Sequence, residues 1–558
     1  METGKTGNKT SKETGIKTYT TDVSSGQVPF TFLETQKAVK KAVEVSTPLL
    51  AISSPDPAAT IAWVTETVSN QKQRSFFVWD VVNGLLSATE NSNQTYNSFI
   101  KYIAANNNDD SNNERESREE ALARTTNLPE MLKFLINCPA YTIVFVHNAH
   151  LFFQFEPVIQ GLWNLRDKFK MKNCSLVLLG PSFSGSIPLE LSQDIVCIDE
   201  ELPTREIITN IVKSQYDSLS RQLKGGFEKP SNEEIEKISS YLTGMSAYTA
   251  EQRFALAITR NGMDYRLLAQ QKRQAVQTVP GLQYEQWSQK FSDIGGLTEI
   301  MSFLTRYMNG VLRPSVFVRI DELEKYIGGA GTDGGGDTSG VSQDALGVVL
   351  STMEDYGMTG MILAGIPGSG KSLISKSLSG EYGIPLISQD IGAARGSLVG
   401  LSEKNIRAQM KLIKGMAGSQ MGGAFYIATC NRISSLPPEL KRRFRLGTWF
   451  FDLPTQEELM PIWNINLKRY GLNDEPLIEH SLTGSDVNNI CYLAYALKCS
   501  VQEARKYVTT VAESDPESIE KLRASSSGKF LSSSYPGTYY EPSEKLLRQN
   551  TDRTMTLD

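Results

Sequence analysis

The chain has 558 residues, of which 40% are hydrophobic, 9% are aromatic and 21% are charged. At about 150 residues per domain this length predicts several domains, and the composition excludes a wholly disordered chain, a collagen-like fibre and a disulfide-stapled miniprotein. The 57 basic and 62 acidic residues give a net charge of −5, which argues against a dedicated nucleic-acid binder because such proteins usually carry a basic excess. The sequence has no apolar run of about twenty residues, so we expect no insertion into a membrane. Six scattered cysteines without a CxxC pair indicate a reducing, intracellular compartment.

The first half of the chain alternates apolar runs with segments of helical periodicity, which predicts a parallel sheet covered by helices over residues 28–280. Residues 1–27 are rich in Thr and Lys and are expected to form a disordered arm. The expected strands are 48–54, 74–82, 141–149, 174–181 and 194–202.

A second α/β unit is predicted over residues 290–454, interrupted by the Gly-rich stretch GGAGTDGGGDTSG at 328–340. Residues 455–514 read as a helical subdomain, and Thr455 with Glu458 three positions later has the spacing of a capping box. The Ser-, Tyr- and Pro-rich residues 525–558 are expected to form a disordered tail.

The strongest chemical signal is GIPGSGKS, which fits the phosphate-binding pattern G-x-x-x-x-G-K-[ST] between an apolar strand and a helix. Glycines let successive backbone N–H groups curl around a phosphate, and the helix N-terminus adds its positive dipole end. We therefore expect ATP as ligand, with Lys371 reaching the β- and γ-phosphates and Ser372 binding Mg²⁺. The expected nucleotide-binding residues of this loop are Gly365, Ile366, Pro367, Gly368, Ser369, Gly370, Lys371, Ser372 and Leu373.

Hydrolysis also needs an acid that holds Mg²⁺ and a base that orients the attacking water. The apolar run SVFVRIDELEK ends in Asp321, the expected second Mg²⁺ partner, and Glu322, the expected water activator. Two acids at a strand end also occur for purely structural reasons. Arg319 is unusual inside this strand because a buried guanidinium needs a partner.

Two further elements could complete a hydrolytic site. The strand GAFYIATCN ends in Asn431, whose amide could position the water or simply form a turn. The segment LPPELKRRFR then presents Arg442, Arg443 and Arg445, either as a solvated face or as arginine fingers for a neighbouring subunit's nucleotide.

Together these motifs resemble the AAA ATPase module of the classical clade over roughly residues 290–510. FSDIGGL resembles the segment that opens that module beside the adenine, GSLVGLSEKNIR the loop and helix after its second strand, and ATCNRISSLPPELKRRFR its second region of homology. LTGSDVNNICYLAYAL resembles the lid helix over the nucleotide. The resemblance adds Asp293, Ile294, Gly295 and Gly484 to the expected nucleotide-binding residues.

The first half is similar to the degenerate N-terminal AAA-like domain of the hypothetical chloroplast reading frame forty-six family of cyanobacteria and plastids. LPEMLKFL, TIVFVHNAHLFF, SLVLLGPS and LPTREII carry this likeness. The implied fold class is α/β: a parallel-sheet P-loop AAA module with a helical lid, preceded by a degenerate AAA-like domain.

The chain departs from the family pattern in three places. The acidic strand precedes the P-loop, so the sequence predicts that the strand at 316–320 lies between those at 384–389 and 424–430 in a sheet of otherwise usual order. Leu398 stands where classical unfoldases carry a pore aromatic, which puts forceful threading in doubt. SSPDPAAT, at 53–60, lacks the Gly and Lys of a P-loop, so no ATP binding is expected in the first half.

The leading hypothesis is an ATP-hydrolysing AAA protein with Mg²⁺ as cofactor, assembled as a ring, expected to be a hexamer, that remodels an unknown protein partner. One alternative is a nucleic-acid-acting motor or clamp that uses Arg395, Lys404 and Arg407. Another is an ATP-gated scaffold with little turnover. The expected location is cytoplasmic, and the resemblance adds the plastid stroma as an alternative.

Overall fold

The computed structural model describes residues 33–69, 74–105, 117–183, 185–222, 230–259, 262–326, 341–393, 401–418, 423–431 and 438–544. The expected arm of residues 1–27, the Gly-rich stretch at 328–340, Arg395 and Leu398 lie outside these residues. No helix within the described ranges is long and apolar enough to cross a lipid bilayer.

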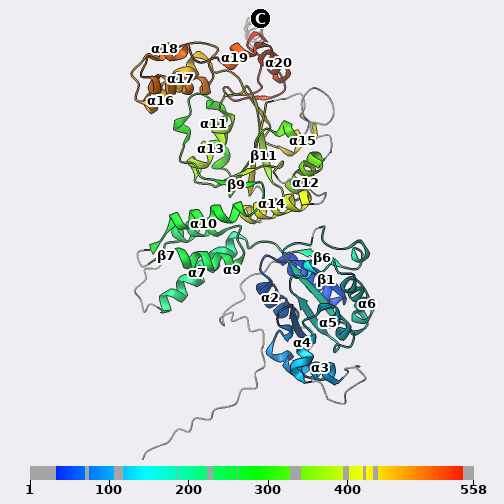
Figure 1. Cartoon of the computed structure of the whole chain (residues 1–558). Coiled ribbons are helices and arrows are strands. Elements are labelled where there is room, and N and C mark those ends of the chain that lie inside the picture. Colours follow the sequence, from blue (N-terminus) through cyan, green and yellow to red (C-terminus); the bar gives the residue numbers. More distant parts are fainter. Residues whose placement is uncertain are drawn as a thin grey trace, which may run out of the picture. The chain divides into compact units, whose positions relative to one another are not determined.

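The described chain forms two compact units (Figure 1). The first runs to Glu201 and includes Ser246–Tyr248, and the second holds Leu202–Met245 and everything from Thr249 onward. This division differs from the expected domain boundary near residue 280. The reason lies in packing: a Cβ on Gly415 would lie 2.9 Å from the Leu202 side chain, so the start of the 202–245 segment is held against helix α14 of the second unit.

The first unit is a six-stranded sheet of order β3-β2-β4-β5-β1-β6, parallel except for the β2–β3 pair. Its central strands are apolar and buried on both faces, as parallel sheets require. Helices α3 to α6 cover one face and α1 and α2 the other. The strands are β1 (Leu49–Ser53), β2 (Ser75–Asp80), β3 (Gly84–Ser87), β4 (Thr142–Val146), β5 (Ser175–Gly180) and β6 (Val196–Asp199). The helices are α1 (Leu33–Glu44), α2 (Pro57–Ser69), α3 (Asn93–Ala105), α4 (Arg118–Arg124), α5 (Leu128–Leu135) and α6 (Glu156–Lys172).

A helical segment and a small hairpin lead toward the second sheet. The Thr204 hydroxyl accepts a hydrogen bond from the Ile207 amide at 3.4 Å, where α7 begins. The elements are α7 (Arg205–Gln222), α8 (Asn232–Leu242), α9 (Ala247–Ala257), β7 (Ile258–Thr259), β8 (Gly262–Met263) and α10 (Tyr265–Gln277).

The second sheet has seven strands in the order β15-β14-β11-β13-β10-β12-β9, parallel except for β9. Helices α11 and α13 cover one face, and α12 and α14 cover the other (Figure 1). The strands are β9 (Leu282–Glu285), β10 (Val316–Ile320), β11 (Thr359–Gly365), β12 (Leu386–Gln389), β13 (Ala424–Cys430), β14 (Thr448–Phe451) and β15 (Leu531–Ser532). The helices are α11 (Thr298–Met308), α12 (Val341–Asp355), α13 (Lys371–Tyr382), α14 (Leu401–Ala417) and α15 (Pro438–Arg443).

Strand β10 precedes the P-loop strand β11 in the chain but lies between β12 and β13 in the sheet, as predicted. Phe317 pairs with Leu386 on one side and with Phe425 on the other. The chain reaches β11 through a turn at Gly357, whose φ of 59° suits glycine. The mixed α/β fold class with parallel sheets is therefore confirmed, and the carboxyl ends of β10, β11 and β13 meet at one edge of the sheet.

A helical lid follows the second sheet. Its first helix opens with the predicted capping box: Thr455 accepts from the Glu458 amide at 3.3 Å, and Glu458 accepts from the Thr455 amide at 2.9 Å. The helices are α16 (Gln456–Tyr470), α17 (Gly484–Leu497), α18 (Val501–Arg505) and α19 (Val511–Ser514).

The C-terminal segment contradicts the expectation of a disordered tail from residue 525. Helix α20 (Pro516–Ser526) is followed by β15, which pairs with β14, and the described chain continues to residue 544. Two contacts with Asp452, at the end of β14, hold this segment: Arg523 Nε donates at 2.8 Å and the Tyr539 hydroxyl at 2.7 Å. Phe450 also makes apolar contacts with Phe530 and Tyr539. Burial and an ion pair therefore stabilise the C-terminal segment, although its polar composition predicted disorder.

Candidate active site

A cavity of about 740 Å³ lies where the carboxyl ends of β10, β11 and β13 meet the lid. It brings together several parts of the second unit: the stretch before α11, the acidic pair, the P-loop, the ends of β13 and β14, the lid helices and the C-terminal segment. Of the residues expected from the sequence, it is lined by Asp293, Ile294, Gly295, Asp321, Glu322, Pro367, Gly368, Ser369, Gly370, Lys371, Ser372, Leu373, Asn431 and Gly484.

The P-loop backbone is built on left-handed glycines. Gly365, Gly368 and Gly370 have φ values of 143°, 81° and 99°, which only glycine adopts readily. A Cβ on Gly365 would lie 2.2 Å from the Phe451 carbonyl oxygen, so the loop leaves the sheet in close contact with β14. Helix α13 then begins at Lys371, which directs its N-terminus toward the cavity.

The Lys371 side chain is buried and stays within the loop. Its Nζ donates to the carbonyl oxygens of Gly365 at 2.8 Å and Ile366 at 2.7 Å. The carbonyl groups of Gly365 and Ile366 therefore hold the lysine side chain, and these two residues do not line the cavity. Burial lowers the pKa of Lys371 to about 8, against an opposing effect of the nearby Glu324 carboxylate.

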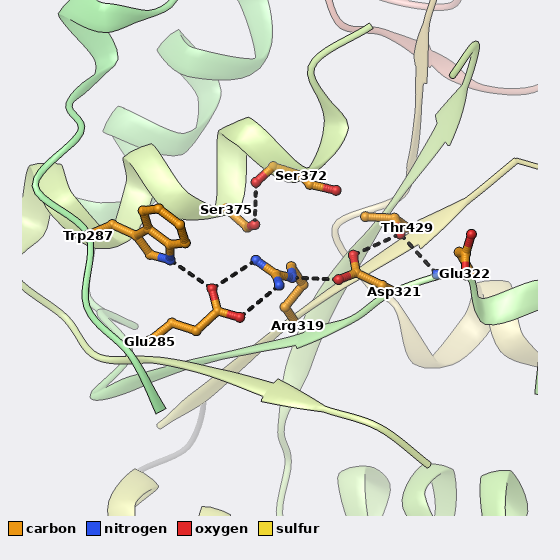
Figure 2. Close-up of polar contacts among 8 residues, drawn as sticks. All are labelled: Glu285, Trp287, Arg319, Asp321, Glu322, Ser372, Ser375 and Thr429. Carbon is orange, nitrogen blue, oxygen red and sulfur yellow. Dashed lines mark hydrogen bonds and ion pairs between the residues drawn. The ribbon is translucent and has the colours of Figure 1, made fainter. Parts of the chain in front are cut away.

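The acidic pair is anchored to the neighbouring strand by Thr429. Its hydroxyl donates to Asp321 Oδ1 at 3.1 Å and accepts from the Glu322 amide at 3.1 Å (Figure 2). Glu322 has a φ of 54°, which turns the chain sharply after the strand. Its carboxylate forms an ion pair with Lys325 on the exposed side of this turn.

Arg319, the unusual residue of β10, finds its partners on both sides. Its Nε donates to Asp321 Oδ2 at 2.8 Å, and its terminal nitrogens donate to the two carboxylate oxygens of Glu285 at 2.8 and 3.2 Å (Figure 2). The Trp287 indole donates to the same Glu285 carboxylate at 2.7 Å. A buried guanidinium is thus satisfied by two carboxylates.

The end of β13 is joined to the acidic turn through a residue that the sequence reasoning missed. Glu324 Oε1 accepts from the Asn431 backbone amide at 3.1 Å. Glu324 Oε2 is buried and has no hydrogen-bond partner among the described residues. Its place two positions after Glu322 in IDELEK was a usable signal, because a turn after Asp321 brings it back to the same edge.

The lid and the segment before α11 close the cavity from the other side. A Cβ on Gly295 would lie 2.5 Å from the backbone nitrogen of Ile462, so this glycine lets α16 approach closely. The Leu297 amide donates to Glu458 Oε1 at 3.2 Å, which ties the same segment to the lid's capping box. Ser534 of the C-terminal segment also lines the cavity, a contact that the expected disordered tail could not have supplied.

Comparison with known proteins agrees with this architecture. The family model described as the SpoVK-like AAA ATPase N-terminal domain matches residues 35–200, and that of the ATPase family associated with various cellular activities (AAA) matches residues 361–420. An uncharacterized AAA domain-containing protein, ycf46, of Guillardia theta is 24% identical over 431 residues, covering 68% of this chain and 75% of that protein. Its namesake of Gracilaria tenuistipitata var. liui is 25% identical over 386 residues, covering 60% and 68%. That of Pyropia yezoensis is 22% identical over 431 residues, covering 66% and 77%.

This chain is similar to AAA ATPases over parts of both of its sheets. The two matches fall on the two sheets: the SpoVK-like match ends one residue before the first compact unit does, and the AAA match begins in β11. The acidic pair at the end of β10 precedes the AAA match in the chain, yet it lines the same cavity as the P-loop.

The arginine cluster lies away from the P-loop cavity. Arg442, Arg443 and Arg445 line a second pocket of about 520 Å³ beside α12. Arg443 forms an ion pair with Glu354, whereas Arg442 and Arg445 are exposed. The structure therefore does not bring these arginines to the nucleotide cavity of their own chain.

The corresponding edge of the N-terminal sheet carries a buried carboxylate just after β6. Glu200, which is only 2% exposed, accepts from the Thr60 hydroxyl at 2.5 Å and from the Trp63 indole at 2.9 Å. Both donors belong to α2, the helix that follows β1. Glu200 therefore joins the end of β6 to α2.

The donor set of the C-terminal cavity fits Mg²⁺. The Ser372 hydroxyl and the Asp321 and Glu322 carboxylates line one cavity, and hard oxygen ligands are those that Mg²⁺ prefers.

Proposed function

We propose that this AAA chain binds ATP with Mg²⁺ in the C-terminal cavity and hydrolyses it to ADP and phosphate. The observation that carries the proposal is the gathering of Lys371, Ser372, Asp321 and Glu322 around one cavity, although the acids come about fifty positions before the lysine in the chain. A P-loop alone would support binding without hydrolysis.

Each residue has a distinct role in this proposal. Lys371 and the backbone N–H groups of the P-loop hold the phosphates, while Gly295 and Gly484 border the nucleotide from the opposite side. Ser372 and Asp321 hold the metal, which when bound offsets the charge that develops on the transferring phosphoryl group. Glu322 orients the attacking water once its carboxylate leaves Lys325, and Asn431 stands at the end of the adjacent strand to fix that water.

We propose further that hydrolysis requires self-association, because the exposed Arg442 and Arg445 can act only on a neighbouring subunit's nucleotide. An arginine finger supplied in trans raises turnover by about 10³–10⁵. The N-terminal unit, which lacks the Gly and Lys of a P-loop at 53–60, is free to select a protein partner that the ring remodels.

The test measures phosphate release per chain against protein concentration, together with oligomer mass by light scattering. Turnover should rise with concentration as oligomers form. Arg442→Ala should lower turnover by at least about tenfold without weakening ATP binding, whereas Arg306→Ala, at an exposed arginine of α11 in the same unit, should leave both unchanged. Full turnover by a monomer would contradict the role in trans.

A further inference from the structure

Arg319 stands between two carboxylates, one of which, Asp321, lines the proposed Mg²⁺ site. It is 7% exposed and lies on β10, two residues before Asp321. Its Nε donates to one Asp321 oxygen, and the Thr429 hydroxyl donates to the other. Glu285 accepts hydrogen bonds from both terminal nitrogens of Arg319 (Figure 2). Neither the motif of the P-loop nor the acidic pair accounts for this arrangement.

The arginine poses an electrostatic problem for the metal. The Arg319 guanidinium, 2.8 Å from Asp321, neutralises that carboxylate. Arg319 and Mg²⁺ would therefore compete for the same negative charge. With Arg319 and Asp321 alone, the pair would have no net charge to offer Mg²⁺.

Glu285 removes this problem. Its two oxygens hold the fork of Arg319 at 2.8 and 3.2 Å, a bidentate geometry that is among the strongest ion pairs. Two carboxylates against one guanidinium leave one net negative charge in the cluster, which is the charge that Asp321 would carry alone.

The placement of Glu285 is itself fixed by neighbouring elements. It ends β9, the antiparallel edge strand, and pairs with Leu386 of β12. Trp287 donates to it at 2.7 Å, and the Trp287 ring lies under the ammonium group of Lys376 on the P-loop helix α13 at 4.3 Å. A Cβ on Gly380 of the same helix would lie 2.0 Å from the Gln289 carbonyl oxygen, so this stretch is packed firmly onto α13.

We propose that Glu285 and Arg319 are positioning residues for the metal: Arg319 orients Asp321, and Glu285 offsets the charge of Arg319 so that Asp321 keeps its affinity for Mg²⁺. This inference rests on the proposed ATP and Mg²⁺ binding of the same cavity. Neither residue touches the nucleotide, and both act through Asp321.

The experiment measures ATP affinity with saturating Mg²⁺ and again with EDTA, in full-length protein carrying Glu322→Gln so that no ATP is consumed. In Glu285→Gln the positive charge of Arg319 is no longer offset and acts on Asp321 alone. The ratio of ATP affinity with Mg²⁺ to ATP affinity in EDTA should therefore fall by about tenfold, at the lower end of outer-shell effects on metal affinity. Affinity in EDTA should stay at the parent value. A loss of general structure would weaken ATP binding in both conditions.

Two further variants separate charge balance from packing. Glu285→Gln combined with Arg319→Met removes both charges, keeps a side chain of similar length and should regain most of the Mg²⁺ effect. Trp287→Phe keeps the ring but loses the N–H donor, and should reduce the Mg²⁺ effect in the same direction with little risk to folding. The matched control is Glu479→Gln in the lid, where Arg505 also bridges two carboxylates, Glu479 and Glu513; it should change neither affinity.

The outcomes distinguish this inference from the proposed function. If the parent binds no ATP in either condition, the proposed function fails. If the parent shows the Mg²⁺ effect and Glu285→Gln retains it in full, or loses affinity equally in EDTA, the positioning role is overturned. If Mg²⁺ tightened ATP binding less in the double variant than in Glu285→Gln alone, the charge balance between Glu285 and Arg319 would not be the cause.

Discussion

The Thr429 hydroxyl and the Asp321 carboxylate, 108 positions apart in the chain, form a hydrogen bond of 3.1 Å across neighbouring strands β13 and β10. The same hydroxyl accepts from the amide of Glu322. One buried threonine therefore fixes both acids of the proposed site.

We expect Thr429→Val to lower ATP turnover while ATP affinity in EDTA is kept, because only the acids lose their anchor. The lost hydrogen bonds should also lower the free energy of unfolding by about 1–3 kcal/mol. Thr429→Ser keeps a hydroxyl group and should retain most of the turnover and most of the free energy of unfolding. Thr359→Val, at the opposite end of the adjacent strand β11, is the control and should leave turnover unchanged. Parental turnover in Thr429→Val would contradict the anchoring role.

The buried Lys371 predicts a pH dependence of ATP binding. Its pKa is lowered to about 8 by burial, whereas the phosphates of bound ATP favour the charged ammonium and raise that pKa again. Binding above pH 8 must therefore take up a proton, and affinity should fall by up to about tenfold per pH unit above 8. Calorimetry at pH 9 in two buffers of different ionisation enthalpy measures this uptake directly. Binding without proton uptake at pH 9 would contradict it.

The close approach of the lid to Gly295 predicts a steric effect. Gly295→Ala places a methyl group 2.5 Å from the Ile462 backbone nitrogen, so α16 must shift, at a cost of about 1–3 kcal/mol in the free energy of unfolding. ATP affinity should fall because the lid borders the same cavity. Gly484→Ala is the matched control for unfolding only, because Gly484 also lines the cavity: its added methyl group meets only the Gly368 carbonyl oxygen, at 3.9 Å. Equal effects of the two variants in thermal unfolding would show that the close contact does not matter.

The absence of Gly and Lys from SSPDPAAT, at 53–60, predicts that the N-terminal unit binds no nucleotide. In the full-length chain, Lys371→Ala should therefore abolish ATP binding altogether, since no second site remains to be detected. Calorimetry with millimolar Mg²⁺ tests this. Residual micromolar binding that depends on Mg²⁺ would place a nucleotide in the N-terminal unit and contradict this prediction.

The sequence predicted those parts of the fold whose signal is local. Apolar runs located β1, β2, β4, β5 and β6, and the glycine spacing located the P-loop. The position of β10 between β12 and β13 was also predictable, because the backbone hydrogen bonds that pair strands do not depend on the order of the strands in the chain.

Other features depend on contacts that no local pattern shows. The two-residue strand β15 is ordered by its pairing with β14 and by the contacts of Arg523 and Tyr539 with Asp452, all supplied by distant segments. Glu285 meets Arg319 only because the short strand β9 adds to the sheet in an antiparallel direction. Arg319 was recognised as needing a partner, but its partner could be named only from the sheet order.

The measurement that tests the central claim most directly compares ATP binding and phosphate release in Glu322→Gln and the parent chain. If the acids of β10 complete the P-loop cavity, the variant should bind ATP with parental affinity and release phosphate at least about a hundredfold more slowly, within the 10²–10⁴-fold contribution of a general base. Asp452, which also lines the cavity and carries a carboxylate, is tied to Arg523 and is not expected to replace Glu322. Phosphate release by Glu322→Gln at the parental rate would show that hydrolysis does not use this acid, and the account of the site would be wrong.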